Sequence, residues 1–379
     1  MNDGDLCARH YATGQPVRVI WQNGRINSVL GANQSTPSDL WIAPALVDLQ
    51  VNGFGGIDFQ QDNAPLGDLV TASRRLHAAG CGRYLLTLIT AKWPQLIARI
   101  HHLRELRQRS AELRHAIAGW HIEGPFLSAE PGFCGAHDPT LMIDPAPDFL
   151  PELREATSDD LVLITIAPER ANALKTIEQA VALGMKVSLG HTNASADLIA
   201  EAVRGGASGF THLGNGCPRE LDRHDNILWR VLETRGLRVS LIPDTIHVSP
   251  ALFRLAHRAL DIGTIYYTAD AMAAAGMKPG RYPLGRLELE VGADQIVRLP
   301  GKPNFAGSAL RPIDGVFRAA KMLGSSWREA WPRLSEIPAK WMGLPCGLAP
   351  GNPADFCLLT VTPENQLKEL KVFVNGKAV

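Results

Sequence analysis

The chain has 379 residues, of which 45% are hydrophobic and 20% charged, and its 38 basic and 38 acidic side chains give a formal net charge of zero. This composition excludes an intrinsically disordered protein, which would be poorer in apolar residues, and argues against a dedicated nucleic-acid binder, which would carry an excess of basic residues. No apolar run reaches the roughly 20 residues of a membrane-spanning helix, so we expect neither a nucleic-acid nor a membrane partner.

The N-terminal segment and the cysteines indicate a cellular compartment. The first residues are polar and lack the basic start and apolar stretch of a secretory signal peptide. The six cysteines are scattered and form no CxxC pair. We therefore expect a cytoplasmic protein with reduced thiols.

The two ends of the chain share a sequence pattern that is typical of β-strands. An Asn-Gly pair at 23–24 lies between two β-favouring runs, which is typical of a hairpin, and a second Asn-Gly at 375–376 follows a strand-like run. Residues 1–43 and 346–379 are therefore predicted to form one small β-sandwich domain.

Between these ends, residues 44–345 alternate strand-like and helix-like patterns. Eight apolar runs are typical of buried parallel strands, at 44–51, 83–89, 116–122, 161–167, 186–190, 208–213, 238–242 and 264–269. Helical spacing of apolar residues predicts helices over 68–79, 94–113, 171–183, 196–204, 226–235, 250–260 and 313–323. Eight βα units predict an α/β fold of the (β/α)8 TIM-barrel type, whose active site lies at the carboxyl ends of the strands.

Two segments exceed a minimal barrel. Residues 124–160, after the third strand, are rich in Pro and Gly and are predicted to form a long loop. Residues 276–311, after the eighth strand, are predicted to form a Gly-rich, partly strand-like insertion. Long loops in a compact domain are usually lids or binding loops.

Acidic and imidazole side chains gather at the predicted carboxyl ends of the strands. Glu123 follows the third strand, His191 the fifth and His212 the sixth. Two imidazoles and one carboxylate with an open position are a common ligand set for catalytic zinc, whose bound water becomes a nucleophile near neutral pH. Asp270, after the eighth strand, is placed to accept a proton from that water and pass it to the leaving group. A lone histidine at a strand end is more often a core residue, but several such groups at one face each need a partner.

Seven segments resemble, in the same order, those of the N-acetylglucosamine-6-phosphate deacetylases of the amidohydrolase superfamily: PALVDLQVNGFGG, HIEGPFLS, GHTNA, THLGNG, IPDTIHV, TADAMAAAGM and FAGS. The resemblance extends from about residue 40 to the C-terminal GNPADF segment. It implies a (β/α)8 barrel with a small β-sandwich made from both termini, an amino-sugar 6-phosphate as substrate, and a homodimer.

The resemblance also implies the catalytic roles. Glu123, His191 and His212 match the ligands of the catalytic divalent metal, and Asp270 matches the general base and acid. His247 matches a histidine that contacts the substrate and helps to polarise the scissile amide.

The remaining implied contacts hold the sugar and its phosphate. His137 matches a sugar-contacting histidine, and Asn215 and Gly216 match positions on the phosphate side of the substrate. Arg223, eleven residues after His212, falls where the family places a phosphate-binding arginine. Its planar guanidinium pairs with two phosphate oxygens.

Gln50 and Asn52 bear on the number of metal ions. Many amidohydrolases carry His-x-His after the first strand and use it to hold a second metal, whereas this chain has Gln50 and Asn52 there. Because neutral amides are not among the usual zinc ligands, we expect one tightly held ion per chain, with Gln50 near its water, and a weakly bound second ion stays open. Zinc is expected first, although the same donors also accept iron, manganese or cobalt.

Three departures from the family pattern affect the substrate wall. LGNGC at 213–217 stands in place of a larger LFNAM or LYNAM, RHDN at 223–226 in place of REPG, and PDTIHV at 243–248 in place of ADGIHV. Three functions therefore stay open: deacetylation of N-acetylglucosamine-6-phosphate, deacetylation of N-acetylgalactosamine-6-phosphate or another N-acyl compound, and a non-catalytic barrel that binds a sugar phosphate.

Overall fold

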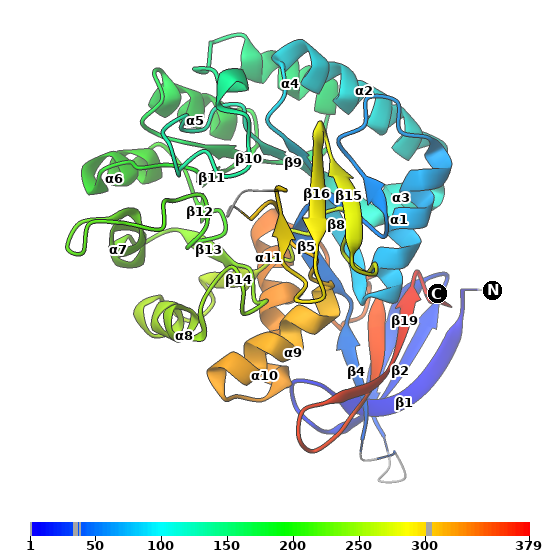
Figure 1. Cartoon of the computed structure of the whole chain (residues 1–379). Helices are drawn as coiled ribbons and strands as arrows, with labels where there is room; N and C mark the ends of the chain where they lie inside the picture. Colours follow the sequence, from blue (N-terminus) through cyan, green and yellow to red (C-terminus); the bar gives the residue numbers. More distant parts are fainter. Residues whose placement is uncertain (1, 33–36, 38, 301–304) are drawn as a thin grey trace.

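The computed structural model describes residues 2–32, 37, 39–300 and 305–379. Residues 1, 33–36 and 38 of the predicted N-terminal segment lie outside the described residues. Figure 1 shows a barrel of strands ringed by helices, with a separate sheet made from the two ends of the chain. The predicted α/β barrel with a separate β domain from both termini is confirmed.

The barrel contains eight parallel strands, hydrogen-bonded in sequence order. They are β5 (Leu46–Val51), β8 (Cys81–Ile89), β9 (Ile117–Glu123), β10 (Leu161–Ile166), β11 (Lys186–Leu189), β12 (Gly209–Phe210), β13 (Arg238–Leu241) and β14 (Ile265–Tyr267). A single parallel bridge between Val51 and Ala271 joins the first strand to the segment after the last one, so the barrel is nearly closed. Each of the eight predicted strands is present.

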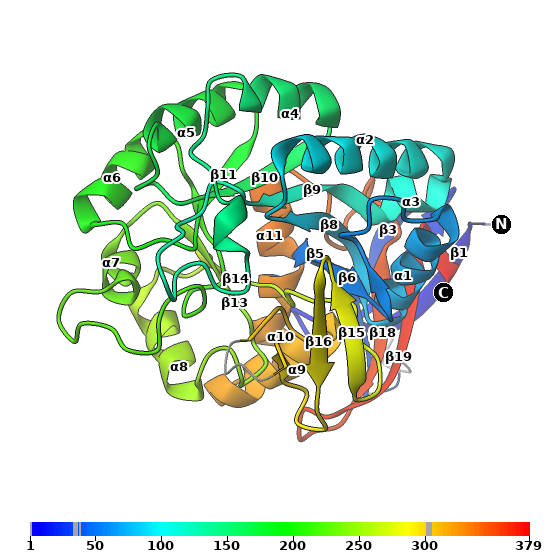
Figure 2. The same ribbon diagram turned by 45° about the horizontal axis from the view of Figure 1, so that its top comes forward.

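Most of the helices cover the outside of the barrel (Figure 2), whereas Trp341 and Met342 of the last helix pack against Val47, Leu49 and Leu163 of the barrel strands. The helices are α1 (Leu66–Ala78), α2 (Trp93–Arg109), α3 (Ala111–Ala116), α4 (Phe149–Thr157), α5 (Ala173–Ala182), α6 (Ala196–Arg204), α7 (Ile227–Glu233), α8 (Pro250–Ala259), α9 (Pro312–Leu323), α10 (Trp327–Ala330) and α11 (Glu336–Met342). α6 and α8 begin where Ser195 and Ser249 accept hydrogen bonds from the backbone N–H groups of Leu198 and Leu252, which satisfies donors that a helix start leaves open. None of the described helices is long and apolar enough to cross a membrane.

Two predicted boundaries were wrong. The segment 124–160 is not all loop, because it contains a 3-10 turn (Pro139–Leu141) and α4. The sequence does not reveal this helix, because Pro151 resembles a helix breaker. Pro151 lies in the first turn of α4, where a missing N–H costs no hydrogen bond. The predicted helix 94–113 is two helices, because the Ser110 side chain accepts from the Leu113 backbone and starts a new helix.

The terminal domain is one seven-stranded sheet in the order β20-β19-β18-β4-β1-β2-β3. Its strands are β1 (Gly4–His10), β2 (Pro16–Gln22), β3 (Arg25–Gly31), β4 (Leu40–Pro44), β18 (Phe356–Val361), β19 (Leu367–Val374) and β20 (Lys377–Ala378). β4 pairs with β1 on one side and β18 on the other, which joins the two ends of the chain. The Asn-Gly pairs at 23–24 and 375–376 turn the two hairpins with positive φ at all four residues. The predicted hairpin at 23–24 is therefore confirmed, and the second Asn-Gly pair turns another hairpin between β19 and β20.

The insertion after the eighth strand forms a second small sheet. Its strands are β15 (Gly280–Leu284), β16 (Leu287–Val291) and β17 (Val297–Arg298). Leu284, Leu289 and Val297 are buried in a cluster with Met272, which follows Asp270 by two residues. This apolar contact fixes the insertion beside the carboxyl ends of the barrel strands, where the short β6 (Gly53–Phe54) and β7 (Ile57–Asp58) also lie.

Candidate metal centre and substrate pocket

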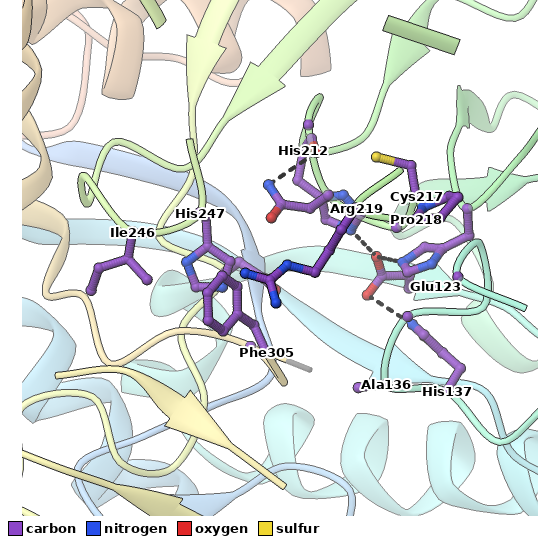
Figure 3. Close-up of a pocket in the computed structure, with 18 of the residues that line it drawn as sticks. Glu123, Ala136, His137, His212, Cys217, Pro218, Arg219, Ile246, His247 and Phe305 are labelled. Atoms are coloured by element: carbon purple, nitrogen blue, oxygen red, sulfur yellow. Dashed lines mark hydrogen bonds and ion pairs between the residues drawn. The ribbon is translucent and has the colours of Figure 1, made fainter. Parts of the chain in front are cut away.

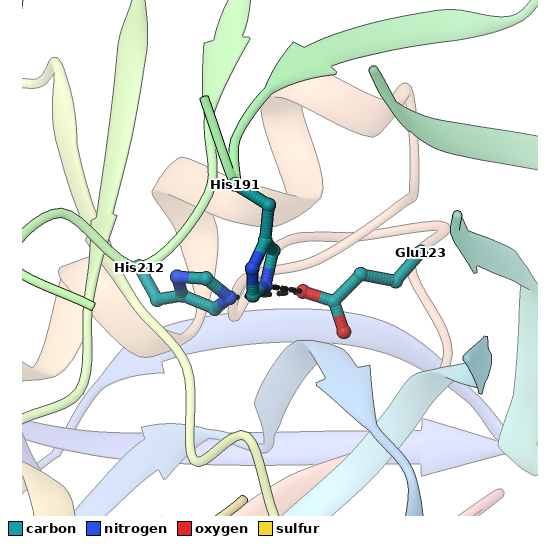
Figure 4. A group of neighbouring side chains, drawn as sticks. All are labelled: Glu123, His191 and His212. Atoms are coloured by element: carbon teal, nitrogen blue, oxygen red, sulfur yellow. Dashed lines mark hydrogen bonds and ion pairs between the residues drawn. The ribbon is translucent and has the colours of Figure 1, made fainter. Parts of the chain in front are cut away.

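Glu123, His191 and His212 converge at the carboxyl ends of three barrel strands (Figure 4). All three are buried, and their ligand atoms lie within 4.8 Å of one another. Nε2 of His212 is 2.9 Å from Oε1 of Glu123, and Nε2 of His191 is 3.4 Å from the same oxygen. Three sequence-distant residues thus present two nitrogens and a carboxylate to one point.

The protonation of this group suits a cation. Burial alone would raise the pKa of Glu123, but hydrogen bonds from His191 and His212 outweigh it and hold that pKa well below its usual range. Nδ1 of His191 is 2.8 Å from the carbonyl oxygen of Phe133, an acceptor that would keep a proton on Nδ1 and free Nε2 to bind a cation in place of its hydrogen bond to Glu123. The donor set fits a divalent cation, because a carboxylate and two neutral imidazoles are its usual ligands.

Asp270 lies beside the group, three residues after β14. Its Oδ1 accepts a hydrogen bond of 2.7 Å from Nδ2 of Asn52. Burial, and then the negative charge of Glu123, raise the pKa of Asp270 to about 8. A carboxyl group with a pKa near neutrality is suited to take up and return a proton.

The backbone at these positions is unusual. His191, His212 and Asp270 have φ values of 50°, 33° and 49°, in the left-handed region that non-glycine residues rarely adopt. Such conformations persist where the surrounding structure enforces them, and they cluster at functional sites.

Asp48 holds the segment before Asp270 in place. Its buried carboxylate accepts from the Thr268 hydroxyl at 2.5 Å, from the Ala269 backbone N–H at 2.9 Å and from the Gln50 backbone N–H at 3.1 Å. It thereby ties the end of β14 to β5, across the seam where the barrel closes. The sequence analysis did not assign this role to Asp48.

His247 is held by Asp244. Nδ1 of His247 is 2.6 Å from Oδ2 of Asp244, whose other oxygen accepts from the backbone N–H groups of Ile246 and His247 at 2.8 Å each. Burial would raise the pKa of Asp244, but the hydrogen bond from His247 outweighs it and lowers the pKa. Nε2 of His247 is buried without a partner among the described residues. The ring of Phe305 lies 5.1 Å from the imidazole and covers it (Figure 3).

A cavity of about 940 Å³ opens over these residues. Of the predicted site residues, its lining includes Glu123, His137, His191, His212, Asn215, Gly216, His247 and Asp270. Nε2 of His137 lies 3.8 Å from Oε2 of Glu123, and burial, followed by the neighbouring His191, lowers the pKa of His137 to about 3. His137 is therefore a neutral ring at the edge of the metal group.

Two of the predicted site residues do not line this cavity. Arg223 is exposed and does not line the cavity. Gln50 is buried beside the cavity, and its Nε2 donates to Oε1 of Glu123 at 3.0 Å. The amides of Gln50 and Asn52 thus each hold a carboxylate.

The backbone conformation after His212 requires glycine at positions 214 and 216. Gly216 has a φ of 60°, and a Cβ there would lie 2.7 Å from Nδ1 of His191. Gly214 has a φ of 94°, where a side chain is strained. A bulky aromatic residue at 214 would therefore require a different backbone path.

The chain is similar in sequence to proteins of known activity. No family model matches the chain. The N-acetylglucosamine-6-phosphate deacetylase of Bos taurus is 31% identical over 353 residues, which cover 89% of this chain and 83% of that protein. The chain belongs to the N-acetylglucosamine-6-phosphate deacetylase family. It is therefore an amidohydrolase-type hydrolase, as the motifs predicted.

Solved structures agree with this family. A mutant deacetylase from Mycobacterium smegmatis, in complex with N-acetyl-D-glucosamine-6-phosphate, matches with a TM-score of 0.88 and 28% identity over 99% of both chains. N-isopropylammelide isopropylaminohydrolase from Burkholderia multivorans matches with a TM-score of 0.59 and 16% identity, over 99% of this chain and 98% of that one. The second likeness shows the amidohydrolase fold alone.

The sequence analysis assigned no role to Asp244, to Phe305 of the FAGS segment, or to two arginines of the cavity wall, Arg219 and Arg298. Asp244 had a signal, because it lies three residues before His247 after the seventh strand. Arg219 had a weaker one, since it is four residues after Asn215 on the same loop. Phe305 and Arg298 lie in the insertion, whose path the barrel pattern does not determine.

Proposed function

We propose that this deacetylase hydrolyses the N-acetyl group of N-acetylglucosamine-6-phosphate to the free amine and acetate. One observation carries the proposal: Glu123, His191, His212 and Asp270 line a single cavity in a member of this family. A related structure, 28% identical, is a complex with the same sugar phosphate.

Glu123, His191 and His212 would hold one divalent cation per chain, with zinc the first candidate because this donor set is common at catalytic zinc sites. When bound, such a cation supplies Lewis-acid polarisation of the acetyl carbonyl and a water molecule of lowered pKa. We do not expect Gln50 and Asn52 to extend the set, because neutral amides are not among the usual zinc ligands; their amide nitrogens each donate to a carboxylate.

Asp270 would move the proton. As the carboxylate, it takes the proton of the attacking water, and it then donates that proton to the amine nitrogen as the C–N bond breaks. Asn52 keeps the carboxyl group oriented through the bond to Oδ1.

His247 would hydrogen-bond the substrate through Nε2, which has no partner among the described residues. Donation to the acetyl oxygen requires protons on both ring nitrogens, and the carboxylate of Asp244 stabilises that charged ring. His137, Asn215 and Gly216 line the same cavity and would contact the sugar and its phosphate.

We further propose a homodimer in the cytoplasm. The assembly rests on the family resemblance. The compartment rests on the cysteines, since Cys7, Cys81, Cys134, Cys217, Cys346 and Cys357 are all free thiols. Light scattering of the purified protein tests the dimer.

Acetate release from a substrate panel tests the reaction. Purified protein of measured metal content is incubated with N-acetylglucosamine-6-phosphate, N-acetylgalactosamine-6-phosphate and both unphosphorylated sugars. Fastest turnover of N-acetylglucosamine-6-phosphate supports the proposal. Faster turnover of N-acetylgalactosamine-6-phosphate would make that epimer the substrate. The altered cavity wall at 213–217 would then account for the change of specificity. No release from any of the four, with metal bound, would overturn the proposal.

A further inference from the structure

A second cavity, of about 550 Å³, lies where the barrel meets the terminal sheet. Its walls come from α1, α3 and the hairpin of β19 and β20, and Figure 1 shows α1 beside β19. His115, on this wall, comes two residues before β9 begins, whereas Glu123 is the residue where β9 ends. The cavity is therefore at the amino ends of the barrel strands, away from the metal group. Junctions between domains are preferred places for small-molecule sites.

His77, in the last turn of α1, brings an unused acceptor to this cavity. The side chain lines the cavity and the residue is 1% exposed. Its Nδ1 is 2.9 Å from the carbonyl oxygen of Cys81, and because a carbonyl oxygen only accepts, Nδ1 carries a proton. Burial lowers the pKa of His77, which keeps the ring neutral and leaves a lone pair on Nε2. This Nε2 is buried without a partner among the described residues. A buried acceptor of this kind calls for a donor.

The charged groups around the cavity are mostly paired already. Nε and Nη2 of Arg74 lie 2.8 and 2.9 Å from the two carboxylate oxygens of Glu112. Nε2 of His115 is 2.7 Å from Oδ2 of Asp355. Lys377 is exposed, so water solvates its ammonium group. The cavity therefore does not require an ionic ligand.

We propose that this cavity binds a small neutral molecule that has an apolar body and one N–H or O–H group, and that this group donates to Nε2 of His77. The proposal goes beyond the proposed function and does not depend on it. Small apolar side chains suited to such a body, and two amides, form the rest of the described wall: Ala111, Val374, Ala378 and Val379, with Asn2 and Asn375. A molecule held there touches both the barrel and the terminal sheet, so it binds the folded junction and stabilises it.

Two probes of nearly the same size and shape test the proposal. Indole has an apolar ring system with one N–H donor, and benzothiophene has no such donor. In titrations of the wild-type protein followed by ligand-observed NMR, we expect indole to bind about 2- to 10-fold more tightly than benzothiophene, the range for one hydrogen bond. Indole should also raise the melting temperature.

Two histidine variants show which residue is responsible. His77→Phe keeps a ring but removes the acceptor, so indole and benzothiophene should bind it equally. His102→Phe is the matched control, because Nε2 of His102 on α2 is already 2.8 Å from the carbonyl oxygen of Ala64 and lies outside the cavity. It should keep the preference for indole. Acetate release should be unchanged in His77→Phe, since the cavity lies away from the metal group.

A direct reading of His77 keeps the test independent of the variants. In protein labelled with ¹⁵N at histidine, the signal missing from His77→Phe identifies Nε2 of His77, and indole should shift that signal in the wild-type protein. If His77→Phe does not fold, the same titration is read as a shift of any one neutral ring nitrogen. No binding of indole, equal binding of both probes to the wild type, or no shifted signal would overturn the proposal and leave a water molecule as the partner of Nε2.

Discussion

At the scale of single residues, the site depends on two carboxyl groups that differ in their pKa. Glu123 is kept ionised by two imidazoles, whereas the pKa of the buried Asp270 is raised towards neutrality. The two groups are near neighbours, and the charge of Glu123 contributes to the shift of Asp270. One carboxylate is therefore suited to hold a cation and the other to exchange a proton.

Asp270→Asn should abolish most turnover and leave the metal bound. An amide of nearly the same shape cannot take up the proton, so we expect kcat to fall by about 10²- to 10⁴-fold, the range for general acid–base catalysis. Glu123, His191 and His212 remain intact, so metal content measured by elemental analysis should match the wild type. Near-normal kcat in this variant would show that Asp270 is not the base.

Metal binding should release the proton of Asp270. In the metal-free protein the pKa of Asp270 is about 8, so at pH 7 the group is mostly protonated. A cation offsets the charge of Glu123 and lowers that pKa, so the proton leaves. Titration calorimetry in two buffers of different ionisation enthalpy should show about one proton fewer released by Asp270→Asn than by the wild type at pH 7. The difference should vanish above pH 9, where Asp270 is already ionised. Equal proton release by both proteins at pH 7 would contradict the assignment.

At the scale of elements, the seam between β5 and β14 is the critical joint. β14 covers only Ile265–Tyr267, so the barrel closes through the Asp48 carboxylate, one bridge and the backbone hydrogen bonds to the Ala271 carbonyl rather than through a long strand pair. Asp270, whose backbone is in the left-handed region, lies three residues after the end of β14. The hydrogen bonds of Asp48 to Thr268 and Ala269 help to enforce this backbone conformation.

Asp48→Ala should lower both stability and kcat. It leaves buried donors of Gln50, Thr268 and Ala269 without an acceptor, so we expect the free energy of unfolding to fall by about 3 kcal/mol. Because the segment before Asp270 loses its anchor, kcat should fall while KM changes little. Denaturant unfolding and steady-state kinetics measure the two effects. Thr268→Val, which removes one of the three donors, should lose less stability; an equal loss would argue against Asp48 as the anchor.

At the scale of the whole molecule, Asp355 joins the terminal sheet to the barrel. Its Oδ2 lies 2.7 Å from Nε2 of His115 and 3.5 Å from Nε of Arg83, and its Oδ1 accepts from the Asn375 backbone at 2.8 Å. Burial would raise the pKa of Asp355, but the bond from His115 outweighs it and the pKa is lowered. The chain ends are thus held to the barrel by an ionised carboxylate.

Asp355→Asn should destabilise the protein at neutral pH and not at low pH. A carboxyl whose pKa is lower in the folded than in the unfolded chain stabilises the fold above the unfolded pKa of about 3.9, and this contribution is lost as the pH falls through the lowered value. We expect a loss of about 3 kcal/mol at pH 7, as for other broken buried pairs. Thermal unfolding of both proteins between pH 7 and pH 3 measures the difference, which should shrink with acid. A constant difference would assign the effect to packing.

The sequence by itself determined the barrel, the terminal sheet and the cluster that can hold a metal. Eight apolar runs and two Asn-Gly turns are local signals, and the carboxyl ends of parallel strands must meet at one face, which brought Glu123, His191 and His212 together. Helix α4 was not predicted, because Pro151 resembles a helix-breaking residue unless its position in the first turn is known.

Only the tertiary structure decided the details around this cluster. Whether an arginine lines the cavity within one chain depends on the path of a loop held by packing, as at Pro218 against Gly132, and the structure has Arg219 in the cavity lining and Arg223 outside it. Likewise, the pKa of Asp270 and the anchoring by Asp48 arise from burial and from partners more than 200 residues apart in the chain. Such long-range contacts leave no periodic pattern, so the fold had to be known before they could be seen.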